Sequence, residues 1–190
     1  MDHTDILDFW FGAPGSPDYC QPRTAWFSPD PDFDAAIAAN FGNVVRDALA
    51  GGLRDWDAHG SFGLLARILV LDQFPRNLFR GSPRSFAGDA LALEAAQQLR
   101  MSGAHLRLQP VQQWFAYMPF EHAEDMAMQD LSLSLFTELA REHPGFDEVL
   151  AWVRKYHGVI ARFGRFPFRN DVLGRESTPA ELAFLQQIQP

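Results

Sequence analysis

The stretch SFGLLARILVLDQF, residues 61–74, is apolar on nearly every side when it is placed on a helix. Such a helix needs neighbours all round to cover it, so we expect it to form the centre of the fold. Pro75 follows it directly, and proline disfavours the helical conformation of the residue before it. The sequence therefore predicts a central helix that ends near residue 74 and carries Asp72 close to its end.

Helical spacing of apolar residues recurs along the rest of the chain, whereas the strict alternation typical of a strand is absent. The clearest helix start is TPAE, residues 178–181, where Thr178 and Glu181 form a capping box. The pattern predicts an all-α fold of about eight helices in antiparallel pairs, packed as a compact bundle or a short superhelix. The expected helices cover residues 5–11, 32–49, 61–74, 84–101, 110–118, 119–142 and 146–163, and the last starts at 178.

Length and composition limit the class of protein. The chain has 190 residues, of which 47% are apolar and 21% are charged, so we expect a single domain over residues 1–190. A net charge of −8 argues against a nucleic-acid binder that uses a broad basic surface. Cys20 is the only cysteine and cannot form an internal disulfide. The acidic start and the short apolar runs predict neither a secretion signal nor a membrane span, so we expect a cytoplasmic protein.

The apolar stripe of the expected helix at 119–142 extends back onto polar residues near its start. Burying a carboxylate without a partner is costly, so an inward cluster requires cations, hydrogen-bond donors or a metal nearby. The alternative is a surface position, because acidic residues are favoured in a first helical turn. The residues on this face are Glu121, Glu124 and Asp125, with His122 at its edge.

The local charge along the chain predicts a partner for these acids. Residues 117–148 contain eight acidic residues and one arginine, whereas residues 154–175 contain six basic residues and one aspartate. Segments of such opposite charge are expected to meet, either as a structural salt-bridge network or as an open pocket. His157 lies on the apolar stripe of the helix at 146–163, where a histidine is more often a core residue than a ligand.

Two similar phrases, LDQFPRNLFR at 71–80 and RFGRFPFRN at 162–170, hold most of the remaining candidates. In each, we expect Phe-Pro to end a buried helix and turn the chain, so that Arg-Asn is presented at the end of the turn. Two such turns that converge would form a cradle of planar donors suited to a carboxylate or a phosphate. A simple ion pair between Asp72 and Arg76 is the alternative for the first phrase.

These segments, with FEHAEDMAMQD and the early DFWFG, resemble a widespread, mostly bacterial family known only as a domain of unknown function. The resemblance covers nearly the whole chain and implies a tetratricopeptide-like superhelical all-α fold, with no established activity or cofactor. Phe168 stands where many members are expected to have histidine, so we expect no proton transfer at that position. The polar signature of the family falls on Asp72, Arg76, Asn77, Arg80, His122, Glu124, Asp125, His157, Arg165, Arg169 and Asn170.

The leading hypothesis is a site that binds a small anionic molecule, a phosphate or a carboxylate, either as a binding site alone or as a catalytic one. His122 or His157 would act as the acid–base group, oriented by Glu124 or Asp125. The sequence indicates no particular cofactor. The residues expected to bind the ligand are Asp72, Arg76, Asn77, Arg80, Glu121, Arg165, Arg169 and Asn170.

Other functions stay open. A tetratricopeptide-like adaptor would hold a peptide in a groove lined by the same polar residues. A metal could be bound by Glu121, His122 and Asp125 with His157 opposite, although no cysteine ligand accompanies them. The charges could also form a purely structural ion network. The heavy aromatic content, 17 Phe and five Trp, leaves a homo-oligomer possible. Phosphate-binding glycine loops, nucleophile elbows and dinucleotide fingerprints are absent from the sequence.

Overall fold

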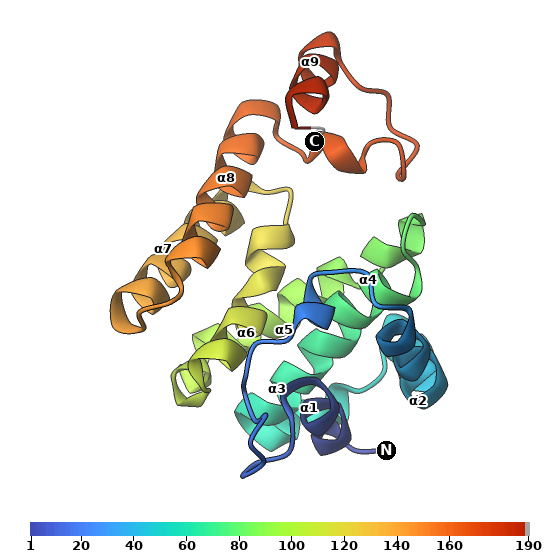
Figure 1. The fold of residues 1–190 in the computed structure, drawn as a ribbon, viewed down its shortest axis with the longest axis vertical. Helices are drawn as coiled ribbons and strands as arrows, with labels where there is room; N and C mark the ends of the chain where they lie inside the picture. The colour runs from blue at the N-terminus through green and yellow to red at the C-terminus, as the bar shows by residue number, and fades with distance from the viewer. Residues whose placement is uncertain (189–190) are drawn as a thin grey trace. The chain divides into compact units, whose positions relative to one another are not determined.

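The computed structural model describes residues 1–188, and every regular element among them is helical (Figure 1). This confirms the prediction of an all-α fold, whereas the choice between a superhelix and a bundle stays a prediction. None of the helices in this part of the chain is long and apolar enough to cross a membrane. The α-helices are α1 (His3–Phe11), α2 (Pro31–Leu49), α3 (Gly60–Ile68), α4 (Phe74–Leu78), α5 (Asp89–Met101), α6 (Pro110–His122), α7 (Met126–Glu142), α8 (Asp147–Phe163) and α9 (Pro179–Ile188).

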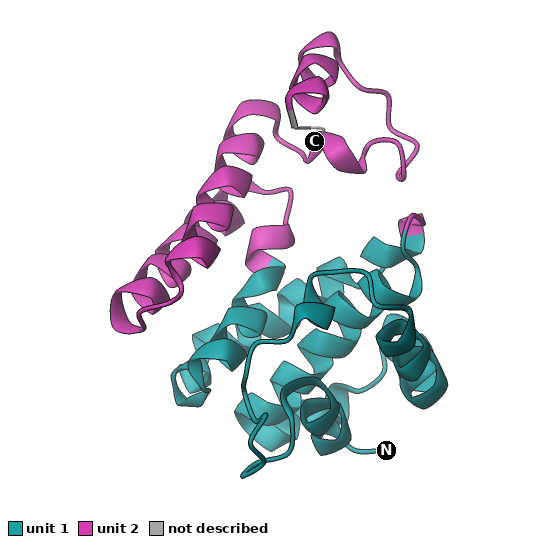
Figure 2. Ribbon diagram, viewed as in Figure 1, with its two compact units in different colours: residues 1–80, 84–119 teal, residues 81–83, 120–190 magenta. Residues whose placement is uncertain are grey.

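The chain divides into two compact units, which are coloured separately in Figure 2. Unit 1 comprises Met1–Arg80 and Arg84–Pro119, and unit 2 comprises Gly81–Pro83 and Phe120–Pro190. The boundary between the long segments falls inside α6. Each unit has its own buried residues and is described by itself below.

The stretch at residues 61–74 lies at the centre of unit 1, as predicted. Leu65, Ile68 and Leu69 are completely buried, and the surrounding elements include α1 and α5. The prediction that the helix ends before Pro75 is wrong. The backbone passes from α3 through one wider π-helical turn, Leu69–Gln73, into α4, where Pro75 occupies the first turn. The π-helical turn already interrupts the regular i→i−4 hydrogen bonds before Pro75, so a proline without an N–H group is tolerated inside this continuous helical segment.

Two glycines let backbone segments of unit 1 approach each other closely. A Cβ atom on Gly63 would lie 1.8 Å from the carbonyl oxygen of Trp56, and one on Gly88 would lie 2.1 Å from that of Leu71. Real Cβ atoms do not approach a carbonyl oxygen this closely, so both positions require glycine. Gly88 thereby seats the start of α5 against the π-helical turn.

Unit 2 is built on the antiparallel pair of α7 and α8. The predicted apolar stripe of α7 is confirmed for Leu135, Phe136 and Leu139, which are buried. Helix α8 ends as predicted at Gly164, whose φ of 69° is the left-handed conformation that favours glycine. A further cluster, formed by the buried Val159, Ile160 and Phe166 with the half-buried Phe163 and Phe184, connects α8 to the C-terminal segment.

The predicted boundary between the helices at 110–118 and 119–142 is wrong. Helix α6 continues through Pro119 to His122, and α7 begins only at Met126. The side-chain amide of Gln129 donates to the carbonyl oxygens of Glu121 and Ala123, at 2.6 and 2.8 Å, and so satisfies the end of α6. The acidic residues at 121–125 therefore belong to a helix end and a linker, not to one face of a single helix.

Candidate functional site

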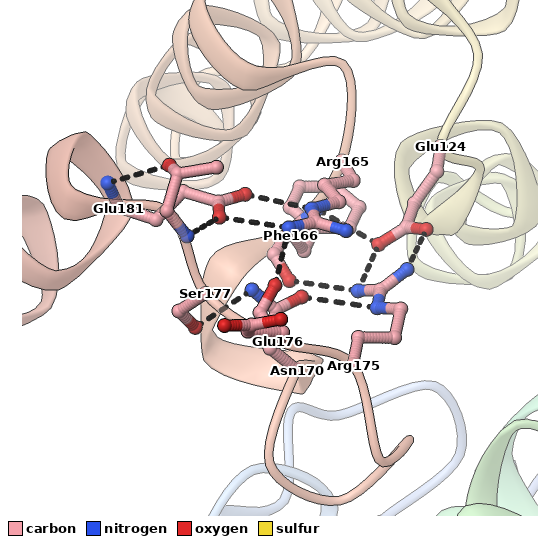
Figure 3. Close-up of polar contacts among 9 residues, drawn as sticks. Glu124, Arg165, Phe166, Asn170, Arg175, Glu176, Ser177 and Glu181 are labelled. Atoms are coloured by element: carbon pink, nitrogen blue, oxygen red, sulfur yellow. Dashed lines mark hydrogen bonds and ion pairs between the residues drawn. The ribbon is translucent and has the colours of Figure 1, made fainter.

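The acidic and basic residues predicted for unit 2 do meet, in a network of charged hydrogen bonds (Figure 3). The carboxylate of Glu124 accepts two hydrogen bonds from the guanidinium of Arg175, at 2.5 and 2.9 Å, and one from the backbone N–H of Phe166, at 2.7 Å. Burial acts to raise the pKa of Glu124, but these donors outweigh it and hold the pKa below its usual value. Glu124 therefore lies as a charged group between α6 and the segment after α8.

Arg165 faces a second carboxylate in the same unit. Its Nε and Nη2 atoms donate to the two oxygens of Glu181, at 2.7 and 2.8 Å, and Nη2 also donates to the carbonyl of Glu176 at 2.9 Å. Glu181 additionally accepts from the backbone N–H of Thr178, which confirms the predicted capping box. Hydrogen bonds from Arg165 and from this N–H lower the pKa of Glu181 to about 2. The cap of α9 is thus also the counter-ion of Arg165.

The Arg-Asn end of the second phrase is also held internally. Arg169 donates to the carbonyl oxygen of His122 at 3.1 Å, and its guanidinium lies 4.5 Å above the ring of Phe166. Asn170 donates to the hydroxyl of Ser177 at 2.9 Å and accepts from Nε of Arg175 at 3.0 Å. Arg175 was missed as a site residue, although the excess of basic residues up to position 175 was the available signal.

The other predicted residues of unit 2 have separate roles. Asp125 caps α7, since its Oδ1 accepts from the N–H of Met128 at 3.0 Å. His157 on α8 forms its contact with Asp130 on α7, at 2.8 Å between Nε2 and Oδ1. Glu121 is buried in the last turn of α6. Within residues 1–188 no group of three or more His, Cys, Asp or Glu side chains could hold a metal ion, so the metal hypothesis gains no ligand set.

The first phrase lies on α4 of unit 1 and is paired with two neighbouring helices. Arg76 donates to Asp89 at the start of α5, at 2.9 and 3.1 Å, and forms an ion pair with Asp72 at 3.2 Å. Asn77 and Arg80 both donate hydrogen bonds to a different carboxylate, that of Asp34 on α2. The predicted convergence of the two phrases joins residues of different units and stays a prediction.

Asp34 is the link between α2 and α4. Its carboxylate accepts from Nδ2 of Asn77 at 2.7 Å and from Nε of Arg80 at 3.0 Å. Burial acts to raise the pKa of Asp34, and the hydrogen bonds from Arg80 and Asn77 outweigh it, so the pKa is lowered. This network fixes the distance between the two helices immediately beside a groove.

The groove lies in unit 1 between α2, the end of α4 and Arg84, and has a volume of about 550 Å³. This volume falls in the range of small-molecule sites. Apolar or small residues form most of its lining, which includes two arginines and no acidic residue. The lining residues are Ala38, Gly42, Val45, Arg46, Leu49, Ala50, Leu78, Phe79 and Arg84.

Three of these residues give the groove its character. Gly42 stands in the middle of α2, and a Cβ atom there would meet nothing within 4 Å, so the groove keeps free space at this point. Arg46, one turn further along α2, is exposed, and its side chain has neither an ion-pair nor a hydrogen-bond partner in the described part of the chain. The guanidinium of Arg84 lies 3.9 Å above the ring of Phe79. The groove can therefore take an apolar body together with a negative charge.

The comparisons with known proteins agree with this fold. Residues 6–189 match the model of a family described as "Bacterial protein of unknown function (DUF924)". The fold is similar to the solved structure of a protein of unknown function from Agrobacterium tumefaciens, with a TM-score of 0.83, 35% sequence identity and 97% of each chain covered. A comparison with curated proteins finds no match. The chain therefore belongs to the bacterial family of unknown function DUF924.

Proposed function

We propose that the protein binds a small amphipathic anion, a carboxylate or a phosphate ester with an apolar body, in the groove beside α2. The observation that carries this proposal is the lining, which combines seven apolar or small residues with Arg46 and Arg84 and lacks any acidic side chain. Each charge-assisted hydrogen bond to the ligand is worth about 1.5–3 kcal/mol. The apolar body adds the free energy of the surface that it buries.

The anion-binding role thereby moves away from the arginines expected from the sequence. Arg76, Arg165 and Arg169 already donate to carboxylates or carbonyls of the chain. An external anion at Arg165 would have to displace Glu181 from two short hydrogen bonds. Arg46 has no such competitor in the described part of the chain, so an anion binds it without displacing an internal carboxylate, and solvent screens the attraction of this exposed side chain.

The ligand class is tested by isothermal titration calorimetry with linear carboxylates of increasing chain length and with the matching alkyl phosphates. Each CH₂ group that enters the groove should strengthen binding about fourfold, since burying one is worth about 0.8 kcal/mol. The gain should stop when the groove is full. Neutral alcohols of the same length should bind more weakly, because they lack the charge that Arg46 attracts.

The site itself is tested by filling it. We expect Gly42→Leu to abolish binding without loss of stability, because leucine is a better helix former than glycine and projects into free space. Gly158→Leu is the matched control, since Gly158 also lies inside a helix, α8, with nothing within 4 Å of a Cβ position. Arg46→Met should weaken anion binding more than alcohol binding. Unchanged carboxylate binding by Gly42→Leu would refute the proposed site.

A further inference from the structure

Unit 1 buries one arginine whose hydrogen-bonding capacity is only partly used. Arg67 on α3 is 2% exposed, and its Nη1 atom forms an ion pair with Oδ2 of Asp57 at 2.9 Å. Its Nε and Nη2 atoms are also buried, yet neither has a hydrogen-bond partner within residues 1–188. Buried donors of charged groups nearly always have an acceptor, so these two nitrogens indicate a binding partner from outside the chain.

The two unused donors lie on the same edge of the guanidinium group. Its planar fork directs the N–H groups of Nε and Nη2 to one side, where both can reach a single acceptor group. Arg165 in unit 2 shows this edge occupied, because its Nε and Nη2 atoms donate to the two oxygens of Glu181 at 2.7 and 2.8 Å. Asp57 holds only Nη1 of Arg67, which is not part of this edge.

Arg67 lines a small pocket between the end of α2, its own helical segment and α5. The volume of about 10 Å³ is close to the smallest that holds one particle of the size of water. Apart from Arg67, the lining consists of apolar residues and glycines together with Arg54 and Glu94. The pocket therefore suits a single small ion and is too small for an organic ligand.

The charges of the lining favour an anion. Arg54 and Glu94 are 52% and 49% exposed and pair with each other through two hydrogen bonds, at 2.7 and 3.0 Å. This pair is neutral, so Arg67 is the remaining charge of the lining, and Asp57 is not part of that lining. Burial lowers the pKa of Arg67 although Asp57 acts to raise it. Asp57 thus does not fully offset the burial of the guanidinium charge.

We propose that the Nε and Nη2 edge of Arg67 binds one monatomic anion in this pocket, a halide such as chloride. One ion can accept from both N–H groups at once. A chloride ion is only slightly larger than a water molecule, and the exposed pair of Arg54 and Glu94 can move outward at little cost to supply the remaining space. The pocket shares no lining residue with the groove beside α2, so this inference does not depend on the proposed function.

Anomalous diffraction from crystals of the full chain soaked in sodium bromide locates the ion. Bromide replaces chloride and, unlike water, scatters anomalously near the bromine absorption edge. We expect an anomalous peak within hydrogen-bond distance of both Nε and Nη2 of Arg67. Crystals that show no anomalous peak at this edge, or only the density of water, would overturn the proposal.

Thermal unfolding tests whether the ion also binds in solution. Replacing sodium gluconate by sodium chloride at about 200 mM should raise the Tm of the wild type by about 2–4 °C, because an ion bound only to the folded state stabilises it. Gluconate has the same charge as chloride but is too large for the pocket.

Arg67→Lys separates this site from general effects of salt. Lysine keeps a positive charge beside Asp57 but lacks the edge with two donors, so the variant should lose the chloride-dependent shift in Tm. Arg165→Lys is the matched control and should keep the shift, since Glu181 already occupies the same edge of Arg165. A wild type without the shift, or a shift that persists in Arg67→Lys, would refute the site. Should Arg67→Lys fail to fold, the bromide experiment on the wild type decides.

Discussion

Phe74-Pro75-Arg76-Asn77 in unit 1 and Phe166-Pro167-Phe168-Arg169-Asn170 in unit 2 use nearly the same residue types for different purposes. In both phrases the first phenylalanine is buried, the proline lies in the first turn of a helical segment and the asparagine is buried. The first phrase continues a helix, whereas the second follows the break at Gly164. The residue types that the two segments share thus determine a local conformation, but they do not determine whether the segment continues a helix or follows a helix end.

The partners of the polar residues differ more than the phrases do. In unit 1, Asp34 and Asp89 approach from two other helices and hold α4 against them. In unit 2 the partners come from helix ends and linkers: the carbonyl of His122, the hydroxyl of Ser177 and, beside them, Glu124. The same types of donor therefore connect packed helices in unit 1 and hold an irregular C-terminal segment in place in unit 2. Five measurements test this difference, from the largest expected effect to the smallest.

The largest effect is expected where backbone packs on backbone. Gly88→Ala places a Cβ atom 2.1 Å from the carbonyl of Leu71, so the start of α5 must move and unit 1 should lose about 3 kcal/mol or more of stability. Gly174→Ala is the comparison in unit 2, where nothing lies within 4 Å and only a φ of +64° opposes the change. It should cost about 1–2 kcal/mol. Equal losses in urea unfolding would contradict this account.

Removing the central carboxylates compares the two networks directly. Glu124→Ala leaves Arg175 and the N–H of Phe166 without their acceptor, and we expect a loss of about 1–3 kcal/mol. Asp34→Ala should cost about 0.5–1.5 kcal/mol, because Arg80, whose side chain is 43% exposed, can return to water and only the buried amide of Asn77 loses its acceptor. Chemical denaturation of both variants measures the difference. A more harmful Asp34→Ala would reverse the ranking of the two networks.

The affinity of the groove should depend on the unit 1 network but not on the unit 2 network. Asp34→Ala loosens the link between α2 and α4 and should weaken carboxylate binding, although Asp34 is absent from the lining. Glu124→Ala serves as the matched control and should leave the affinity unchanged. Calorimetric titration of both variants with one linear carboxylate gives the comparison.

Acid should weaken the carboxylate networks in a defined pH range. The pKa of Glu181 is about 2 in the folded protein and lies below the ordinary value of 4.5. Its charged form therefore stabilises the fold above that ordinary pKa, and this contribution is lost as the pH falls toward about 2. Amide signals around α9 should respond in this range. Glu181→Gln should remove that response while leaving the acid response of unit 1, which includes the lowered pKa of Asp34.

The smallest effects are expected from replacing arginine by lysine. Arg175→Lys should cost about 1 kcal/mol, because lysine cannot reproduce the two hydrogen bonds to Glu124. Arg80→Lys should change stability by less than about 0.5 kcal/mol, since the side chain is 43% exposed. Thermal unfolding of the two variants measures the difference between the stability lost at the bidentate Arg175–Glu124 pair and that lost at the solvent-screened Arg80–Asp34 pair.

Prediction from the sequence succeeded for helix caps and terminators, which depend on neighbouring residues. It failed for proline, which either ends a helix or is accommodated within one. The capping box of Thr178 and Glu181 and the terminator Gly164 follow from the local chain. The sequence predicts a helix end at Pro75 and a boundary between residues 118 and 119, yet Pro75 begins a helical turn and Pro119 lies inside α6. A proline is compatible with a helix when its surroundings accommodate the missing N–H, and that is a property of tertiary packing.

The candidate site shows the same division. The meeting of acidic and basic segments in unit 2 was predicted from local charge, and Glu124 with the segment after Gly164 confirms that they meet. Arg46, Arg84 and Gly42 were not predicted as site residues. Their importance depends on which face of α2 is left uncovered by its neighbours, and no short-range pattern contains that information.

The amino-acid sequence by itself determined that this protein is helical, where most of its helices begin and end, and that its charged segments require one another. These properties follow from apolar spacing, capping and local charge, which act over a few residues. The tertiary structure alone decided that most of the predicted arginines already have internal partners while Arg46 stands free beside a groove. A side chain is free or paired according to what the fold places next to it, and those neighbours come from distant parts of the chain.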